Sequence, residues 1–212
     1  MITGNHITAT DIDDLNRYSY NMGAKIYLSN ESNILTNLST EVVKSNYLIK
    51  IPKKTADGYL TFDIGKISFD EDTIYGYLPY TIENIILQAF KCLGDDYDWG
   101  NKYNSRDCSG FVASIYNTMG FVLPRDTAPI EKIPATSSIF TKDVKNELKS
   151  LLPGSLIFKN GHVMLSLGTY NDIPYIIHAF SNGGSSKLLY TTAITTAYVY
   201  DVNILTSALT FK

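Results

Sequence analysis

The stretch Arg106-Asp-Cys-Ser-Gly-Phe111 decides how this chain of 212 residues is interpreted. It opens an amphipathic pattern that runs to Gly120, so a helix is expected to begin at Cys108. Backbone N–H groups point outward from the first turn of a helix and favour negative charge, which makes a thiol held there easier to ionise. Cys108 is therefore a candidate nucleophile. A buried structural thiol is the alternative, and the polar neighbours Asp107 and Ser109 argue against it.

Two histidines follow on apparent β-strands. His162 comes directly after Asn160-Gly161, and an Asn-Gly pair between two apolar runs predicts a tight hairpin. His178 lies within the next apolar run, 175–180. The two rings share a face only if these strands pair in an even register, for example with residue 162 opposite residue 180. In that arrangement His162 is the expected base and His178 the group that orients its ring. A core histidine is the alternative for either residue.

Tyr97 precedes Cys108 by 11 residues, across a polar loop that can fold back over the helix start. Its hydroxyl is then a candidate donor to an oxyanion, and packing beneath the loop is the alternative. The sequence has no CxxC, no HExxH and no acidic calcium loop, so a metal site is not expected.

Composition excludes several classes of protein. The formal charge of −3 gives no indication of binding to nucleic acid or to an anionic membrane surface. No window approaches ~18 apolar residues, so no membrane span is expected. Two cysteines are too few for a disulfide framework, and Cys92, within an apolar helical pattern, is expected to be a buried structural thiol. Residues 1–11 show no secretory leader, which fits a cytoplasmic protein or a mature, trimmed exported form. The oligomeric state is open, with a monomer as the working expectation.

The first third of the chain is typical of a small β-barrel. A short helix from Thr10 or Asp11 through Tyr20 is expected to come first. The predicted strands that follow are 24–28, 34–38, 47–51, 58–64 and 66–69. An acidic run at 70–72 and Pro79 then mark a domain junction.

The remainder predicts an α+β domain, with helices first and an antiparallel sheet second. Helices are expected over 81–93, 108–119 and 144–151, with 121–140 mostly irregular. The predicted strands are 155–159, 162–167, 175–180, 187–191 and 197–203, arranged as a meander.

Several motifs, taken in order, resemble NlpC-type cell-wall peptidases, a papain-like family. They are Tyr97-x-Trp-Gly, Arg106–Phe111, Leu123-Pro-Arg125, Pro153-Gly154 and Gly161–Gly168. The lead-in Gly76–Thr81 resembles a subgroup with SH3-like barrels before the peptidase domain. The resemblance therefore implies a small SH3-like barrel over 1–75, which is expected to be incomplete relative to the family, and a papain-like peptidase domain over 76–212.

The resemblance also implies the chemistry. It implies hydrolysis of γ-D-glutamyl–diamino acid bonds in murein stem peptides or peptidoglycan fragments, with no cofactor. Cys108 is implied as the nucleophile, His162 as the base and His178 as the third member of a triad. Tyr97 is implied near the oxyanion, and Asp107 and Ser109 near the bound peptide.

Two features depart from the family pattern. Gly100-Asn101 stands where the family usually has Gly-Gly, which is expected to shift the loop that holds Tyr97. Residues 6–12 resemble the last strand of a preceding barrel, so the chain is expected to lack a domain that relatives carry. Two other functions stay open: a papain-like amidase or acyltransferase acting on a non-murein substrate, and a catalytically silent wall-binding protein.

Overall fold

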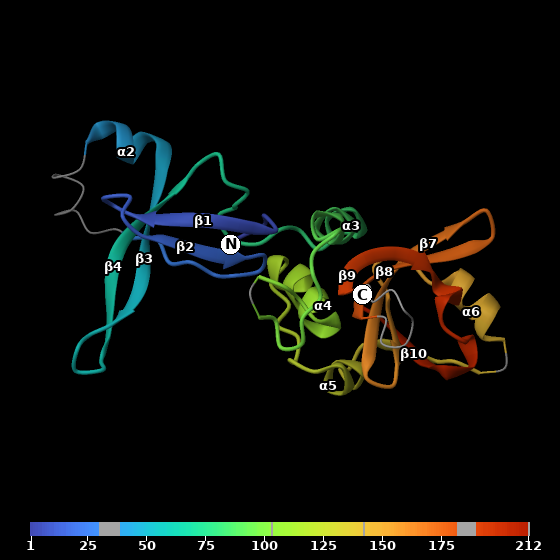
Figure 1. The fold of residues 1–212 in the computed structure, drawn as a ribbon. Coiled ribbons are helices and arrows are strands. Elements are labelled where there is room, and N and C mark those ends of the chain that lie inside the picture. Colours follow the sequence, from blue (N-terminus) through green and yellow to red (C-terminus); the bar gives the residue numbers. More distant parts are fainter. Residues whose placement is uncertain (30–38, 103, 142, 182–189, 212) are drawn as a thin grey trace. The chain divides into compact units, whose positions relative to one another are not determined.

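The fold is that of a computed structural model, which describes residues 1–29, 39–102, 104–141, 143–181 and 190–211 (Figure 1). The chain divides into two compact units, Met1–Tyr77 and Leu78–Lys212. Each unit has its own antiparallel sheet and its own hydrophobic core. None of the described helices combines the length and the hydropathy that crossing a bilayer requires.

The first unit is built on a four-stranded antiparallel sheet in the order β2-β1-β4-β3. Its strands are β1 (His6–Asp11), β2 (Arg17–Asn21), β3 (Asn46–Lys54) and β4 (Leu60–Ser68), with a short helix α2 (Thr40–Ser45) before β3. Alternate side chains on these strands turn inward, as the two-residue period of a strand requires. The buried cluster consists of Ile2, Ile7, Ala9, Ile49, Ile51 and Ile67.

The helix expected from residue 10 or 11 to Tyr20 is wrong, because this segment is the β1–β2 hairpin. The Asp11 carboxylate accepts the backbone N–H groups of Leu15 and Asn16, at 2.8 and 3.2 Å. An aspartate can serve a turn in the same way as it caps a helix, which explains the error. β1 also pairs with β4, so residues 6–11 belong to this sheet and are not the last strand of a preceding barrel.

The two strands expected at 58–64 and 66–69 are one strand, β4, with Gly65 inside it. A Cβ atom at Gly65 would lie 2.7 Å from the Thr10 carbonyl oxygen, so glycine here permits the close approach of β1. The strand expected at 24–28 is reduced to a bridge between Leu28 and Ile49, and 34–38 lies outside the described residues. Within the described ranges no ladder joins β2 to β3, so the sheet is not seen to close.

The second unit has a six-stranded antiparallel sheet in the order β5-β10-β6-β7-β8-β9. The strands are β5 (Thr136–Ile139), β6 (Leu156–Lys159), β7 (His162–Tyr170), β8 (Ile173–Ser181), β9 (Tyr190–Thr196) and β10 (Leu205–Thr210). The helices are α3 (Ile82–Lys91), α4 (Cys108–Thr118), α5 (Thr127–Glu131) and α6 (Val144–Ser150), with 3-10 turns at Ala197–Val199 and Val202–Ile204. This mixed architecture with antiparallel strands confirms the expected fold class at that level.

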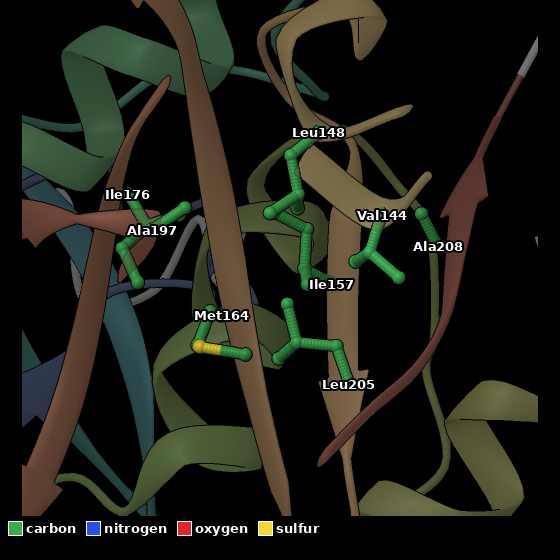
Figure 2. Packing of buried hydrophobic residues seen from close by; sticks show 8 residues of the cluster. All are labelled: Val144, Leu148, Ile157, Met164, Ile176, Ala197, Leu205 and Ala208. Atoms are coloured by element: carbon green, nitrogen blue, oxygen red, sulfur yellow. The ribbon is translucent and has the colours of Figure 1, made fainter. Parts of the chain in front are cut away.

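Helices α4 and α6 both pack against β7 and β8. Figure 2 shows this buried cluster, to which α6 contributes Val144 and Leu148 and β7 contributes Met164. Because side chains alternate along a strand, Met164 shares its face of β7 with His162, and Ile176 shares its face of β8 with His178. The histidines therefore lie at one end of a dry sheet face.

The β7–β8 pairing has the even register that a shared histidine face requires. Leu165 lies opposite Ile177, and continuing this register to the strand ends places residue 162 opposite residue 180. A β-bulge between Ser166 and Gly168 shifts the pairing farther along, where Gly168 lies opposite Tyr175. The bulge lies beyond the histidines, so it does not change which face they share.

Other elements differ from expectation. The stretch 121–140 contains α5 and β5 and is not simply irregular. The strand expected at 197–203 is instead two 3-10 turns, and β10, which was not predicted, lies between β5 and β6. The strand expected at 187–191 lies mostly outside the described residues, and β9 begins at Tyr190.

Candidate functional site

Cys108 is the first residue of α4, as the sequence predicted. Asp107 is the N-cap, and its Oδ1 accepts the backbone N–H of Gly110 at 2.8 Å. The cysteine is 6% exposed, and its Sγ lies 3.7 Å from the Thr127 hydroxyl of α5. The sulfur is thus covered but has a polar neighbour.

Asp107 is also the centre of an ionic network. The Arg125 guanidinium donates to both of its carboxylate oxygens and, at 3.0 Å, to the Ser109 hydroxyl. Ser109 in turn donates to Asp107 Oδ1 at 3.1 Å. Burial alone would raise the pKa of Asp107, but hydrogen bonds from Arg125 and from the N–H groups of Gly110 and Gly100 outweigh it and hold the pKa below its ordinary value. Asp107 therefore carries a negative charge at neutral pH.

The loop before α4 is tied to this cap. Gly100 N–H donates to Asp107 Oδ2, and Asp107 N–H donates to the Asn101 side-chain oxygen, both at 3.0 Å. Asn101 has a φ of 57°, in the left-handed region that asparagine tolerates better than most residues. A Cβ atom at Gly110 would lie 2.1 Å from Asn101 Oδ1, so the glycine leaves the space that this side chain fills. Asn101 thus adds a hydrogen bond that a glycine in its place would lack.

Tyr97 lies in the same loop and is half-buried. Its backbone N–H donates to the Tyr190 carbonyl at 3.2 Å, and the two rings lie 6.5 Å apart. Burial raises the pKa of Tyr97, and the nearby Cys108 and Asp107 raise it further. The phenol therefore lies within electrostatic reach of the cysteine.

His162 and His178 form a buried pair. His162 Nε2 lies 3.0 Å from His178 Nδ1, and His178 Nε2 lies 3.2 Å from the Thr195 hydroxyl on β9. Protons can be arranged along this chain in two directions. If Thr195 is the final acceptor, each histidine carries its proton on Nε2, and Nδ1 of His162 keeps its lone pair. That arrangement makes His162 Nδ1 the basic nitrogen of the pair.

The imidazole pair is neutral at pH 7. Burial, together with smaller effects of the neighbouring His178 and the Lys159 charge, lowers the pKa of His162 to about 3. Burial lowers the pKa of His178 to about 4, again with a contribution from Lys159. His178 also stacks on Phe180, with ring centroids 4.3 Å apart. The resting pair can therefore accept a proton rather than donate one.

Tyr200 completes the surroundings and was not predicted. Its ring lies 5.8 Å from that of His162 and 5.9 Å from that of His178, edge to face with each. Burial raises the pKa of Tyr200 to about 12, followed by the effects of Cys108 and Tyr97. The sequence did not single out Tyr200 among the sixteen tyrosines. Its segment was expected to be a strand, in which a tyrosine is an ordinary packing residue. Thr127, Thr195 and Lys159 were missed for the same reason, since only the tertiary fold brings them to the histidines or the cysteine.

All the predicted site residues belong to the second unit, where they form two groups. Around α4 lie Tyr97, Asp107, Cys108 and Ser109, and on β7 and β8 lie His162 and His178. Cys92, by contrast, is fully buried, and burial raises its pKa to about 11. In the described part of the chain, no three His, Cys, Asp or Glu side chains are arranged to hold a metal ion. A thiol, a neutral imidazole with an oriented lone pair and nearby phenols are the components of nucleophilic acyl chemistry.

Comparison with known proteins identifies the family. Residues 94–202, just over half of the chain, match the NlpC/P60 family, whose members are generally cell-wall peptidases or peptidoglycan-binding proteins. Two similar solved structures are an NlpC/P60 family protein from Bacillus cereus and an NlpC/P60 endopeptidase from Photobacterium damselae subsp. piscicida. The first has a TM-score of 0.68 and 18% identity over 100% of this chain and 62% of the other. The second has a TM-score of 0.71 and 18% identity over 98% of this chain and 52% of the other.

This chain therefore spans less than two thirds of either protein. No curated protein matches it. At identities this low, the two structures show a shared fold only. The family match covers the segment that holds Tyr97, Cys108 and both histidines. The chain belongs to the NlpC/P60 family.

Proposed function

We propose that the chain is a cysteine endopeptidase that hydrolyses γ-D-glutamyl–diamino acid bonds in murein stem peptides. Cys108, His162 and His178 act as its triad. The observation that carries the proposal is the buried contact of 3.0 Å between His162 Nε2 and His178 Nδ1. When His178 donates its Nε2–H to Thr195, this contact leaves Nδ1 as the basic nitrogen of His162, in a domain whose sheet packs against the helix that begins at Cys108.

In the proposed mechanism His162 Nδ1 takes the Cys108 proton, and the sulfur attacks the carbonyl carbon of the γ-glutamyl amide. The backbone N–H of Cys108 and the Tyr97 phenol stabilise the oxyanion. His162 then gives its proton to the departing amine, and activates a water molecule that releases the acyl-enzyme. His178 holds the His162 ring, and Thr195 fixes His178.

Asp107 and Ser109 are the proposed peptide-binding residues. Asp107 keeps its charge at neutral pH and lies beside the nucleophile, where a free L-alanine amine of the stem peptide would find a counter-ion. Ser109 lies one residue beyond Cys108, and its hydroxyl is held by Arg125 and Asp107.

The proposal is tested with synthetic stem tripeptides and tetrapeptides, with product masses as the readout. We expect the native chain to release a new diamino-acid N-terminus. Cys108→Ala should abolish turnover with the fold retained, and His162→Ala should cost at least about 10³-fold in kcat because triad members act as a unit. His6→Ala is the matched control, because the His6 side chain is exposed at the start of β1, and it should leave turnover unchanged. Near-normal turnover by His162→Ala would contradict the assignment.

Iodoacetamide labelling separates an active thiol from a silent wall-binding protein. Cys92 is an internal control, since burial raises its pKa to about 11 and covers it completely. We expect Cys108 to be alkylated at pH 7 while Cys92 stays unmodified, as read by peptide mass mapping. Equal resistance of the two thiols would favour a silent protein. A labelled Cys108 without murein cleavage would favour an amidase or acyltransferase on another substrate.

For the first unit, Met1–Tyr77, we propose an SH3-like module that binds wall material, with the second unit, Leu78–Lys212, as the peptidase domain. The support is its short antiparallel strands around one small core and the Gly76–Thr81 lead-in to the second unit. Co-sedimentation of the Cys108→Ala chain with purified sacculi tests binding. The same chain shortened to residues 78–212 should bind more weakly, and undiminished binding would contradict the proposal.

A further inference from the structure

We propose that Lys159 recognises a carboxylate on the leaving side of the cleaved bond, so that the preferred substrates end in a free α-carboxylate directly after that bond. This inference rests on the proposed peptidase function and specifies its substrate class. A stem peptide cut before its last residue has such a carboxylate, whereas an amidated or extended peptide does not.

Lys159 is placed beside His162 by the sheet. It is the last residue of β6 and the register partner of His162, the first residue of β7, across the Asn160-Gly161 turn. Directly opposed residues of an antiparallel pair project from the same face, with Cβ atoms about 4.5–5.5 Å apart. The lysine and the proposed base therefore emerge together on one face of the sheet.

The Lys159 side chain reaches the ring of Tyr200, which is a neighbour of both histidines. Its Nζ is 4.7 Å from the centre of the Tyr200 ring, which itself meets both histidine rings edge to face. Lys159 is half-buried, so part of its side chain stays accessible to a ligand. A cation–π contact of this kind attracts the ammonium without neutralising its charge.

Lys159 has no acidic partner among the residues that the structure describes, where the ion pairs lie elsewhere. Its positive charge lowers the pKa of both His162 and His178. The other groups that contact this pair are the Tyr200 ring, beside both histidines, and the Thr195 hydroxyl, beside His178. An anion arriving with the substrate would supply the missing counter-charge for Lys159.

The chemistry of the reaction indicates which anion this is. His162 protonates the departing amine, so the nitrogen of that amine must come within hydrogen-bonding distance of its ring. The α-carboxylate of the same amino acid is attached to the carbon next to that nitrogen, and therefore lies on the His162 side of the bond. Pairing it with Lys159 also removes the repulsion between the ammonium and the imidazolium that forms when His162 takes the Cys108 proton.

The test compares two forms of the peptide L-alanyl-γ-D-glutamyl-L-lysine, one with a free terminal carboxylate and one with a carboxamide, and their diaminopimelate counterparts. We expect the native chain to cleave the free acids at least about 10-fold more efficiently in kcat/KM. Lys159→Met keeps the apolar stem and should lose this preference, because the free acids slow while the amides change less than about twofold. Lys159→Arg keeps the charge and should retain the preference.

The outcomes are separable. If the native chain cleaves acid and amide at equal rates, the role of Lys159 is overturned. It is also overturned if the native chain prefers the acid and Lys159→Met keeps the same preference. If no peptide is cleaved, the proposed function fails and this inference fails with it. The pH profile is a further readout: loss of the cation should raise the pKa of the imidazole pair and move the acidic limb of kcat to higher pH. A packing role alone would slow both peptide forms equally and leave that limb in place.

Discussion

The two histidines differ in how their ring nitrogens are used. Both nitrogens of His178 have partners, His162 on one side and Thr195 on the other. His162 contacts His178 through Nε2 only. The His178 ring is thus held through both nitrogens, and the His162 ring is held through Nε2 alone. This asymmetry assigns different roles to two residues of the same type.

Thr195 is a positioning residue in this scheme, and Thr195→Val tests it. The change leaves the buried His178 Nε2–H without an acceptor and allows the pair to reverse its protons, which removes the lone pair from His162 Nδ1. We expect kcat to fall about tenfold with little change in KM. Steady-state kinetics measures both constants.

Thr195→Ser is the matched control, because it keeps the hydroxyl and removes a methyl group. It should restore most of kcat. If valine and serine variants lose the same activity, packing by the methyl group and not the hydrogen bond to His178 would be the cause.

At this scale the sequence predicted the residues with unusual chemistry and missed their partners. Cys108 and the two histidines stood out because a cysteine at a helix start and histidines in apolar strands are uncommon combinations. Thr195 and Tyr200 are ordinary residue types in β-rich segments. Their importance comes from contacts with His178 that only the strand register and the 3-10 turn create.

Among the elements, α4 has the most elaborate N-terminus. Its cap residue, Asp107, accepts from Gly110 and Gly100 and pairs with Arg125, so one carboxylate joins the helix, the preceding loop and the segment before α5. The position of Cys108 relative to Tyr97 depends on this carboxylate.

Replacing Asp107 separates its two contributions to stability. Asp107→Ala should lower the free energy of unfolding by about 1–3 kcal/mol, since the cap is lost and Arg125 loses its partner. Asp107→Asn keeps an oxygen for the Gly110 N–H and should cost less than half as much. Urea denaturation followed by circular dichroism measures both, and equal losses would show that the charge, and not the cap, stabilises the helix.

Prediction of elements succeeded where the local signals were unambiguous. The helix at Cys108 and the hairpin at Asn160-Gly161 appear at the expected residues. The prediction of a helix before Tyr20 was wrong because Asp11 caps a turn there. The prediction of a strand at 197–203 was wrong because this segment, despite its alternating pattern, forms two 3-10 turns. β10 was missed because its place between β5 and β6 is fixed by partners more than 40 residues earlier in the chain.

For the whole molecule, the neutral histidines predict sensitivity to acid. The pKa of a histidine in the unfolded chain is about 6.5, whereas in the folded chain the pKa of His162 is about 3 and that of His178 is about 4. Between these values the unfolded chain binds more protons than the folded one. The free energy of unfolding should therefore fall as the pH drops from about 6.5 toward 4, by up to about 1.4 kcal/mol per pH unit for each proton.

Denaturant titrations of the native chain and of a His162→Gln, His178→Gln double variant measure this effect. The double variant should show a flatter dependence on pH in that window, while His6→Gln should follow the native chain. Parallel curves for the double variant and the native chain would show that the histidines do not cause the acid sensitivity.

The β-bulge between Ser166 and Gly168 divides the β7–β8 hairpin into two segments that are out of phase by one residue. The turn at its far end, Asn171-Asp172, has positive φ at both residues, as a tight two-residue connection requires. Lengthening or shortening the hairpin at that tip leaves the pairing of Leu165 with Ile177 unchanged. The tip can therefore accept insertions, such as a reporter tag, while the imidazoles at the opposite end stay aligned.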